Sequence, residues 1–375
     1  MVAQEHRYPC DQCGAELRFA PGQSVLKCNH CGHEQRIAAD GGPWSASTKS
    51  FPELDLARGI ADDLPATASQ DVRSTHCTNC GAVVTFQGAN HATQCPFCAS
   101  PLVVDSGAQR TIKPQALIPF QLDETTARKN LITWLGSLWF APNGLLEFTR
   151  AGRKMDGVYV PYWTLDADTQ SRYRGQKGVH YYETRTVTVN VNGKSERRTE
   201  QVQKTRWYPA SGTVSRDFDD VLVIASSSLP RSLGEGLEPW DLSALAAYTP
   251  EYLAGLQAEG YTIALADGHQ TGRVKMAAVI YSDVCRDIGG DVQRVDNIDT
   301  DYDNETFKHI LLPVWMAAYK YSGKSYRFLV NGQTGEVQGE RPWSVWKITF
   351  AVIGAAILIG AAVYGYYLYD PGAFQ

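Results

Sequence analysis

Eight of the nine cysteines form two groups of four with identical spacing. Each group consists of two C-x2-C pairs separated by fourteen residues, and the second group follows the first by 67 positions. The members are Cys10, Cys13, Cys28 and Cys31 in the first group and Cys77, Cys80, Cys95 and Cys98 in the second. Two short C-x2-C turns can direct four thiolates at one Zn²⁺ in a tetrahedral shell. The spacing therefore predicts two structural zinc ribbons, each with one Zn²⁺ as its cofactor.

Other uses of these cysteines fit the sequence less well. A disulfide framework would need an export signal, and the first ten residues contain no apolar stretch that could serve as one. A closed four-thiolate shell leaves no open coordination position, which argues against catalytic zinc. The ninth cysteine, Cys285, is expected to be a small buried apolar side chain.

The charge distribution argues against nucleic acid as a partner. The chain carries a net charge of −5, and residues 76–105 contain neither Lys nor Arg. Phosphate binding depends on those two residue types, because they displace the counterions of the nucleic acid. A protein-binding or purely structural role is therefore favoured for the ribbons.

The carboxyl terminus predicts a membrane span. From Ile348 to Tyr369 the chain has no charged side chain, and a helix of that length is about 33 Å long, enough to cross a bilayer. Trp343 and Trp346 stand at one end of the run, and tyrosines stand at the other, as expected for aromatic belts at the two interfaces. We therefore expect a transmembrane helix over 346–369, anchored by these terminal residues.

Charges beside the span predict its orientation. Arg341 and Lys347 precede the helix, whereas the tail at 370–375 is short and acidic. The positive-inside rule places the amino-terminal bulk in the cytoplasm, at the inner membrane, with the tail outside. Thiolate zinc sites also suit a reducing compartment. Small residues four apart, such as Ala351 and Ala355, would permit self-association through the helix.

Composition divides the rest of the chain into four segments. We assign 1–37 to the first ribbon, 38–75 to a flexible linker, 76–105 to the second ribbon and 111–340 to a middle domain. The linker is rich in Gly, Pro, Ser and Ala, which is typical of a tether, and one helical turn is expected within it around Leu54 to Ile60. Its length predicts that the ribbons are separate beads.

The middle domain has the pattern of an α+β fold. A helix should begin after Asp123, because Leu131 and Leu135 follow at helical spacing. Alternating Thr and Val residues, the turn signal Asn192-Gly193 and a polar segment after it predict a β-hairpin. The mixture of elements predicts a mainly antiparallel sheet.

Three further segments are interpreted as strands: 273–284, 310–321 and 324–339. The string "YVPYW" also resembles "LLPVW" further along the chain, which indicates a duplicated sheet unit. In that case Pro161 and Pro313 should lie on edge strands or at strand starts, where a missing N–H is tolerated.

Motifs for catalysis are absent from the sequence. It contains no phosphate-binding loop, nucleophile elbow or zinc-protease motif in a suitable context, so we expect no enzyme activity. Residues 299–305 imitate the start of a calcium loop but lack its later ligands, and a solvated acidic loop is expected there. The hairpin at 185–206 has a modest excess of positive charge and is expected to be a solvated face.

Several strings resemble a known bacterial family of double zinc-ribbon proteins with one carboxyl-terminal transmembrane helix. They are "GVYVPYW", "FKHILLPVW", "YRFLVNGQTGEVQGERPWS" and the repeated "CxxCGA" knuckles. Members are often labelled TFIIB-type zinc ribbon proteins or likened to primosomal protein N′, although this chain has no helicase phosphate-binding loop. Related proteins occur beside phage-shock-protein-A-like and SPFH-type membrane proteins. The resemblance implies work in envelope stress or membrane maintenance.

These observations predict a membrane-anchored adaptor without enzyme activity. The span would hold the chain at the bilayer, and the ribbons would recruit protein partners, which the resemblance implies are phage-shock-A-like or SPFH-type. The alternative is a nucleic-acid-binding zinc-ribbon protein tethered to the membrane.

Overall fold

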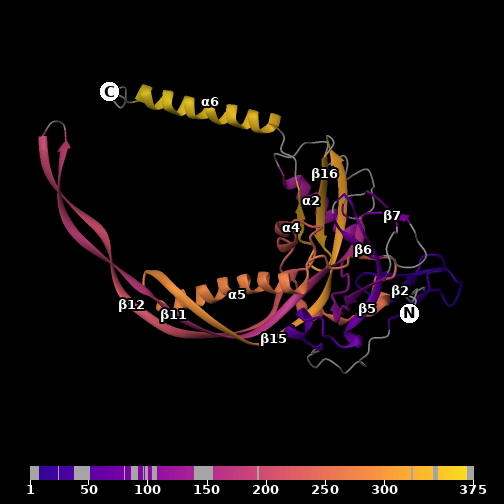
Figure 1. Ribbon diagram of the computed structural model, residues 1–375. Coiled ribbons are helices and arrows are strands. Elements are labelled where there is room, and N and C mark those ends of the chain that lie inside the picture. Colours follow the sequence, from indigo (N-terminus) through magenta and orange to yellow (C-terminus); the bar gives the residue numbers. More distant parts are fainter. Residues whose placement is uncertain are drawn as a thin grey trace.

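A computed structural model gives the fold of the 375-residue chain (Figure 1). It describes residues 8–23, 25–37, 51–79, 81–85, 92–95, 97, 100–103, 108–138, 155–191, 194–321, 324–340 and 345–369. Over these residues the fold is α+β, with one large and mainly antiparallel sheet, three smaller sheets and an apolar helix at the carboxyl terminus. This confirms the predicted fold class. Cys80, Cys98, Trp343, the segment 38–50 and the tail 370–375 lie outside the described residues.

The smaller sheets and the helices consist of the following elements. The small sheets contain β1 (Leu17–Ala20), β2 (Val25–Cys28), β3 (Glu34–Arg36), β5 (Ser69–His76), β6 (Val83–Thr85), β7 (Ala92–Gln94), β8 (Pro101–Val103) and β9 (Ala108–Ile112). The α-helices are α1 (Leu56–Ile60), α2 (Glu124–Ser137), α4 (Arg231–Glu235), α5 (Leu265–Ile288) and α6 (Val345–Tyr369). The 3-10 helices are η1 (Ala66–Ala68), η2 (Leu242–Ala244) and η3 (Pro250–Leu253).

The large sheet is built around three long antiparallel strands in the order β12-β11-β15. Its strands are β4 (Leu54–Asp55), β10 (Ala116–Leu117), β11 (Asp156–Val191), β12 (Lys194–Ile224), β13 (Ala246–Ala247), β14 (Gln257–Ala258), β15 (Val292–Tyr321), β16 (Lys324–Asn331) and β17 (Val337–Gly339). Pro161 and Pro313 lie within β11 and β15, five and twenty-one residues after their starts, so their expected place at strand starts or edges is wrong. Each proline can still occupy a central strand because its carbonyl and its neighbours carry the pairing; the carbonyl of Pro161, for example, accepts from Ala225 N at 2.9 Å.

The sheet consists of two similar halves, which meet at the central strands β11 and β15. Pro161 pairs with Leu311, and Tyr159 pairs with Pro313, so the two prolines occupy equivalent places. β10 pairs in parallel with β15 where β14 pairs in parallel with β11. Each central strand also pairs with an outer strand: β11 pairs with β12, and β15 pairs with β16. The halves α2–β11–β12 and α5–β15–β16 are therefore related by an approximate two-fold rotation.

One tryptophan in each half has the same surroundings. The indole Nε1 donates to a backbone carbonyl 3.1 Å away for Trp163 and 2.9 Å away for Trp315. Each indole also packs against an aromatic ring at a similar distance and tilt, Tyr261 at 5.0 Å and 55° and Phe120 at 4.9 Å and 59°; Trp163 additionally contacts the rings of Phe307 and His309. The sequence echo thus marks two equivalent core positions, while a shared origin of the two halves stays a prediction.

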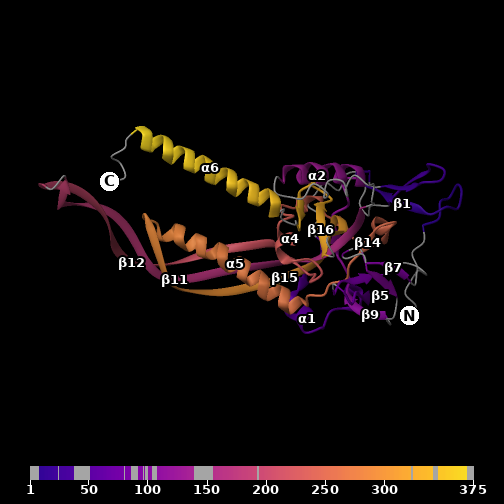
Figure 2. The ribbon, with the colours of Figure 1, turned by 90° about the horizontal axis from the view of Figure 1, so that it is seen from above.

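Helices α2 and α5 cover one face of the large sheet. α2 begins where the sequence predicts, with the Asp123 carboxylate accepting from Thr126 N at 2.8 Å, and it buries Leu131 and Leu135. α5 lies along the long strands (Figure 2). It contains the segment 273–284, so the strand predicted there is wrong.

The helical period of α5 is visible only in its buried residues. They recur every three or four positions: Leu265, Gly268, Gly272, Met276, Ile280, Val284 and Ile288. The exposed side of the helix also carries apolar residues, including Val274 and Tyr281. Their presence hides the amphipathic pattern, because a helix with apolar residues on both sides has no clear period in sequence.

Both amino-terminal cysteine regions pack against the large sheet. In the first, Phe19 N donates to the carbonyl of Ala254 and Gly22 N donates to that of Phe120, both at 2.9 Å. Cys77 and Phe97 from the second lie in a buried cluster on the other face of the sheet. The described parts of the two regions lie in different buried clusters and so are separate from each other, as expected, but they are not independent of the body, because apolar side chains of each region complete the core of the sheet.

The described part of the expected linker is also folded, and α1 matches the helical turn predicted around Leu54 to Ile60. Residues 51–75 contain β4, α1, η1 and most of β5, and β4 pairs with β15. Leu56 is buried in the cluster beneath α5. This part of the segment 38–75 is therefore not a tether, because its alternating leucines provide the apolar contacts that a flexible chain lacks.

The hairpin β11–β12 extends far beyond the rest of the sheet. β15 stops pairing with β11 at Gly178, so residues 179–191 and 194–206 form a two-stranded arm of about 40 Å. The hairpin prediction is confirmed for the strands, while the turn at 192–193 lies outside the described residues. The arm curves away from the body (Figure 1).

Irregular pairing bends the sheet near the base of this hairpin. The register of β11 shifts against both neighbours close to Asp166. Asp220 on β12 and Asn304 on β15 have φ angles of 55° and 51°, a conformation that Asp and Asn tolerate better than most residues. Bulges increase strand twist and bend, which accounts for the curvature of the long strands.

Helix α6 stands apart from the folded body. Its segment Thr349–Tyr366 is long and apolar enough to cross a membrane, and no part of that segment is buried. Large apolar side chains on it are exposed, with 75% of Trp346 and 73% of Leu358 accessible. The predicted apolar helix is confirmed; Ile348 and Tyr369 lie within it.

Candidate metal centre

The first four cysteines converge on one point. One sulfur from each of Cys10, Cys13, Cys28 and Cys31 lies within 4.8 Å of the other three, and the pairs Cys10–Cys31 and Cys13–Cys28 are 3.5 Å apart. A tetrahedral Zn²⁺ site with bonds of about 2.3 Å has sulfurs about 3.8 Å apart. These residues are therefore positioned to hold a metal ion of that size.

Two matching turns position the four sulfurs. Gly14 N donates to the carbonyl of Cys10 at 2.8 Å, and Gly32 N donates to that of Cys28 at 2.9 Å. Both glycines have positive φ, 72° and 77°, a conformation that costs glycine little. The sequence C-x2-C-G therefore dictates this turn, and β1 and β2 hold the two turns side by side.

The four sulfurs shift one another's pKa values in opposite directions: neighbouring sulfurs raise the pKa of Cys13 and, together with burial, that of Cys31, whereas the pKa of Cys28 is lowered. The backbone N–H of Cys31 is the main cause that lowers the pKa of Cys28 to about 6. A metal ion would stabilise all four thiolates together, because it is the only strong positive charge that fits between them. None of the cysteines in the described residues forms a disulfide.

Half of the site belongs to the protein core. Cys10 and Cys28 are buried, whereas Cys13 and Cys31 are exposed. The buried pair lies in one apolar cluster with Phe120. Metal binding is therefore coupled to the packing of this region on the sheet, and the exposed pair marks its outer side.

The second cysteine group shares the turn geometry where it is described. Gly81 N donates to the carbonyl of Cys77 at 2.8 Å, with a φ of 77°, as in the first group. Cys77 and Cys95 are both buried. Because Cys80 and Cys98 lie outside the described residues, a second metal site stays a prediction.

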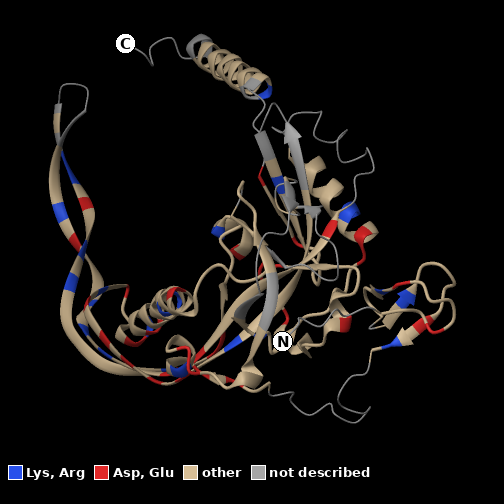
Figure 3. Cartoon of the chain, turned by 45° about the vertical axis from the view of Figure 1, so that its right-hand side comes forward, with Lys and Arg blue, Asp and Glu red and all other residues tan. Residues whose placement is uncertain are grey.

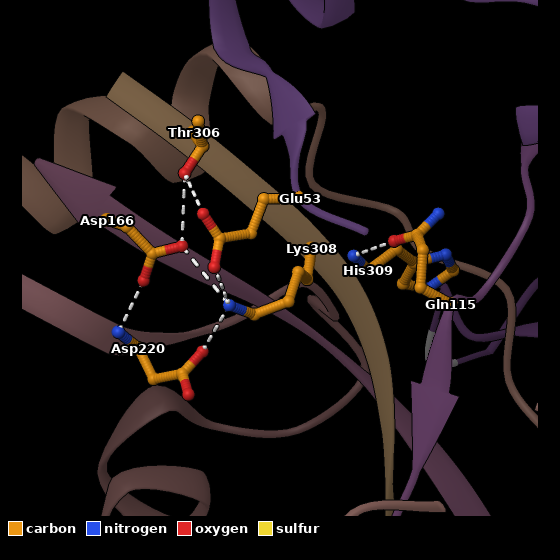
Figure 4. A network of polar contacts seen from close by, with 7 residues as sticks. All are labelled: Glu53, Gln115, Asp166, Asp220, Thr306, Lys308 and His309. Carbon is orange, nitrogen blue, oxygen red and sulfur yellow. Dashed lines mark hydrogen bonds and ion pairs between the residues drawn. The ribbon is translucent and has the colours of Figure 1, made fainter. Parts of the chain in front are cut away.

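A buried lysine forms another polar cluster, at the bend of the sheet (Figure 4). Lys308 Nζ lies 3.2 Å from Glu53, 3.2 Å from Asp166 and 2.9 Å from Asp220. The Thr306 hydroxyl also contacts Glu53 and Asp166, at 3.0 and 3.2 Å. Sequence analysis missed this cluster, because its members come from four distant segments and no local motif marks them.

The cluster is a closed ion network rather than a cation site. Burial alone would lower the pKa of Lys308, but contacts with Asp220, Asp166 and Glu53 raise it above its usual value. Burial raises the pKa of Asp166. The carboxylates of Asp166, Asp219 and Asp220 lie close enough together for a metal ion, but the lysine ammonium already lies between two of them.

His309, next in sequence, is a core residue. Its Nδ1 lies 2.9 Å from the carbonyl of Ile112, which indicates the Nδ1–H tautomer, and its ring contacts those of Trp163 and Tyr261. Burial lowers the pKa of His309 to about 4. The imidazole is therefore neutral at physiological pH.

Other segments singled out in the sequence have structural places. Residues 299–305 lie in β15, so the expected acidic loop is wrong; Arg172 pairs with Asp299 and Asp301 across the strands. Cys285 is half-buried on α5. Arg185 and Arg198 are exposed on the arm, as expected.

Comparison with known proteins gives one distant likeness. The uncharacterized protein YdjG of Bacillus subtilis (strain 168) is 26% identical over 353 residues, which cover 93% of this chain and 94% of YdjG. No protein-family profile and no solved structure match the chain. The likeness therefore spans nearly the whole length of both proteins.

Proposed function

We propose that this chain is a single-pass adaptor at the cytoplasmic face of the inner membrane. The observation that carries the proposal is helix α6, whose large apolar side chains are exposed and whose central segment is not buried anywhere. A helix of this composition is poorly soluble in water, and a bilayer would cover it completely. Trp343, Trp346, Ile348 and Tyr369 would then lie near its two interfaces.

Charge supports the orientation with the folded body inside. Arg341 and Lys347 lie before the apolar run, and the only charged side chain in the tail 370–375 is that of Asp370. The positive-inside rule places such a body in the cytoplasm. The reducing cytoplasm also keeps thiolates available for metal.

Two zinc ions complete the proposed adaptor. The first four cysteines fit a tetrahedral thiolate shell, and the second group repeats its spacing and the first of its two glycine turns. Four thiolates leave no position for substrate, so the ions would act by folding their ribbons.

The ribbons would recruit protein partners from fixed positions on the body. Because the first ribbon is packed on the sheet, its exposed side near Cys13 and Cys31 is the surface it offers. The family resemblance suggests phage-shock-A-like or SPFH-type membrane proteins as partners. The absence of Lys and Arg from residues 76–105 favours protein over nucleic acid.

Purification from native membranes tests both metal and recruitment. We expect two zinc ions per wild-type chain, one in Cys13→Ser and one in Cys77→Ser, measured by elemental analysis of detergent-solubilised protein. Partners crosslinked in cells should be recovered with the wild type and with Cys285→Ser, which changes a cysteine outside both groups, and lost with Cys13→Ser or Cys77→Ser. Partners unchanged in both ligand variants would refute recruitment by the ribbons.

A further inference from the structure

One edge of β11 loses its neighbouring strand where the arm begins. β15 pairs with β11 as far as Gly178, and just beyond it the carboxylate of Asp291 accepts from His180 N at 2.6 Å. From Tyr181 to Val187 no described strand lies along this edge, while β12 pairs with the other edge of β11. An unpaired strand edge offers backbone donors and acceptors to another strand.

Alternate residues of β11 direct their backbone groups toward this edge. The carbonyl of Gly178 accepts from Asp291 N at 2.9 Å, and His180 N donates to the side chain of Asp291, so the even-numbered residues face the edge. The register with β12 has no shift over this stretch. The alternation therefore continues to three further residues, whose side chains are all exposed: Tyr182, Thr184 and Thr186.

The side chains on either side of Thr184 are complementary to a second copy of themselves. When two copies of β11 pair antiparallel with Thr184 at the two-fold axis, Glu183 lies opposite the partner's Arg185, and the symmetry makes this contact twice. Tyr181 then lies opposite the partner's Val187, a favourable pair of an aromatic and a β-branched side chain. Moving the axis by one residue in either direction would place Glu183 or Arg185 opposite its own copy, where like charges repel.

Charges on β12 extend this complementarity across the arm. Glu183 pairs with Lys204 within the chain, and Arg185 lies opposite Glu200 in the register of the hairpin. Between two paired arms each of these β11 side chains would therefore lie between two charges of opposite sign. Figure 3 shows that segments of both signs follow one another along the arm. A mixed pattern of this kind favours a strand with the matching alternation over a uniformly basic or acidic partner.

We propose that the arm is a self-association site, at which β11 of two copies pairs antiparallel over residues 181–187. The two hairpins then form one four-stranded sheet, which is more stable than an isolated two-stranded ribbon. Because the paired stretch is short, the association is weak in dilute detergent and needs two chains confined to one membrane. In this respect it rests on the proposed anchorage by α6. The dimer presents its ribbons in pairs, so a partner with two binding sites would bind it with avidity.

Two-colour imaging of single full-length chains in a supported phosphatidylcholine bilayer tests the pairing. The chains carry a green or a red fluorescent protein at the amino terminus, and pairs of spots that diffuse together are counted at several chain densities. Glu183→Arg brings arginines together at both contacts, and Arg185→Glu brings glutamates together there. Each variant alone should lower the association constant about tenfold or more, because two attractive contacts become repulsive.

A mixture of the two variants locates the contact. Between a green Glu183→Arg chain and a red Arg185→Glu chain, both contacts again join opposite charges, so co-diffusion should return nearly to the wild-type level. Each variant has the same internal changes in the mixture as it has alone, and recovery therefore reports the contact between chains. Arg174→Glu is the control, because it reverses an exposed charge of β11 outside the paired stretch and should leave co-diffusion unchanged.

Three results would overturn the proposal. Single variants that associate as well as the wild type would place the contact elsewhere, for example in α6. Single variants that stay apart in the mixture as well would exclude this register. Wild-type chains that co-diffuse no more often than chance predicts would leave the edge of β11 to a strand from a different protein.

Flotation separates this proposal from the anchorage. Wild-type chain should float with phosphatidylcholine vesicles after an alkaline wash, because α6 holds it in the bilayer. A chain that the wash removes refutes the anchor, and with it the confinement that the pairing needs. A chain that floats but does not co-diffuse refutes only the pairing of the arms.

Discussion

The two halves of the large sheet share a core and differ in what extends from it. Trp163 and Trp315 occupy equivalent places, each with a tilted aromatic neighbour about 5 Å away and one carbonyl partner for its indole. Yet β12, the outer strand of the first half, has 31 residues, whereas β16 in the second has eight. The core that both halves share is therefore the part that the fold requires, and the arm is an extension of the first half alone.

The helices of the two halves also differ. α2 has 14 residues and α5 has 24, and α5 lies along the longer strands of the first half. Two of its glycines face buried side chains: a Cβ on Gly268 would meet Trp163, and one on Gly272 would meet Leu165. Helix α5 thus approaches the sheet closely near its amino-terminal end.

The largest expected effect tests whether the two tryptophans are equivalent. Trp163 is fully buried and 6% of Trp315 is exposed, so Trp163→Ala and Trp315→Ala should each lower the free energy of unfolding by about 3–5 kcal/mol. Urea titration of detergent-solubilised protein measures this. Trp163→Phe and Trp315→Phe remove fewer atoms, so each should cost less than the alanine variant at the same site. The order of the two sites by cost should be the same as for the alanine variants. A cost below about 1 kcal/mol at only one site would show that the two tryptophans contribute unequally to the stability of the fold.

The next effect concerns the ion network at the bend. Lys308→Met leaves Asp166 and Asp220 without their cation and should cost about 3 kcal/mol at neutral pH. Lys275→Met is the control, because Lys275 forms partly exposed pairs with Glu235 and Glu238, and its loss should cost under about 1 kcal/mol. Urea titration of both variants gives the comparison.

The pH dependence of Lys308→Met follows from the pKa shifts. The pKa of Lys308 is raised in the folded chain, so its stabilising contribution is present below about pH 10 and is lost as pH rises through the folded-state value. Burial already raises the pKa of Asp166, and removal of the lysine raises it further. Protonation of Asp166 at acidic pH should therefore reduce the deficit of the variant; a deficit that does not change between pH 4 and pH 8 would contradict the network.

Sequence reasoning was strongest where the chemistry is local. The C-x2-C-G turns, the Asp123 cap and the uncharged run of α6 each act over a few residues, so spacing alone specifies them. The echo around Pro161 and Pro313 likewise led to two equivalent positions.

It failed where distant contacts decide the structure. The segment 273–284 is helical because its buried residues fit the sheet, a fact hidden by Val274 and Tyr281 on the exposed side. Residues 51–75 fold because β15 offers them an edge. The partners of Lys308 come from segments far apart, and no pattern in one segment could reveal them.

A smaller effect contrasts the helix glycines of the two halves. Gly272→Ala places a Cβ against the buried Leu165 side chain, and overpacking should cost about 1–3 kcal/mol. A Cβ on Gly136 of α2 would meet nothing within 4 Å, so Gly136→Ala should add about 0.5–1 kcal/mol of stability by favouring the helix. Urea midpoints that move in the same direction for both variants would refute the difference in helix packing.

The smallest expected effect comes from shortening the arm. Deletion of residues 186–191 and 194–199 removes six residues from each strand, so Arg185 and Glu200, which already pair, would flank the Asn192-Gly193 turn. An even number preserves the alternation of paired positions. Because this part lies outside the buried clusters, the free energy of unfolding should change by less than about 0.5 kcal/mol. A loss of several kcal/mol in the urea titration would instead mean that the arm supports the core, and the two halves would then differ in their folding as well as in their reach.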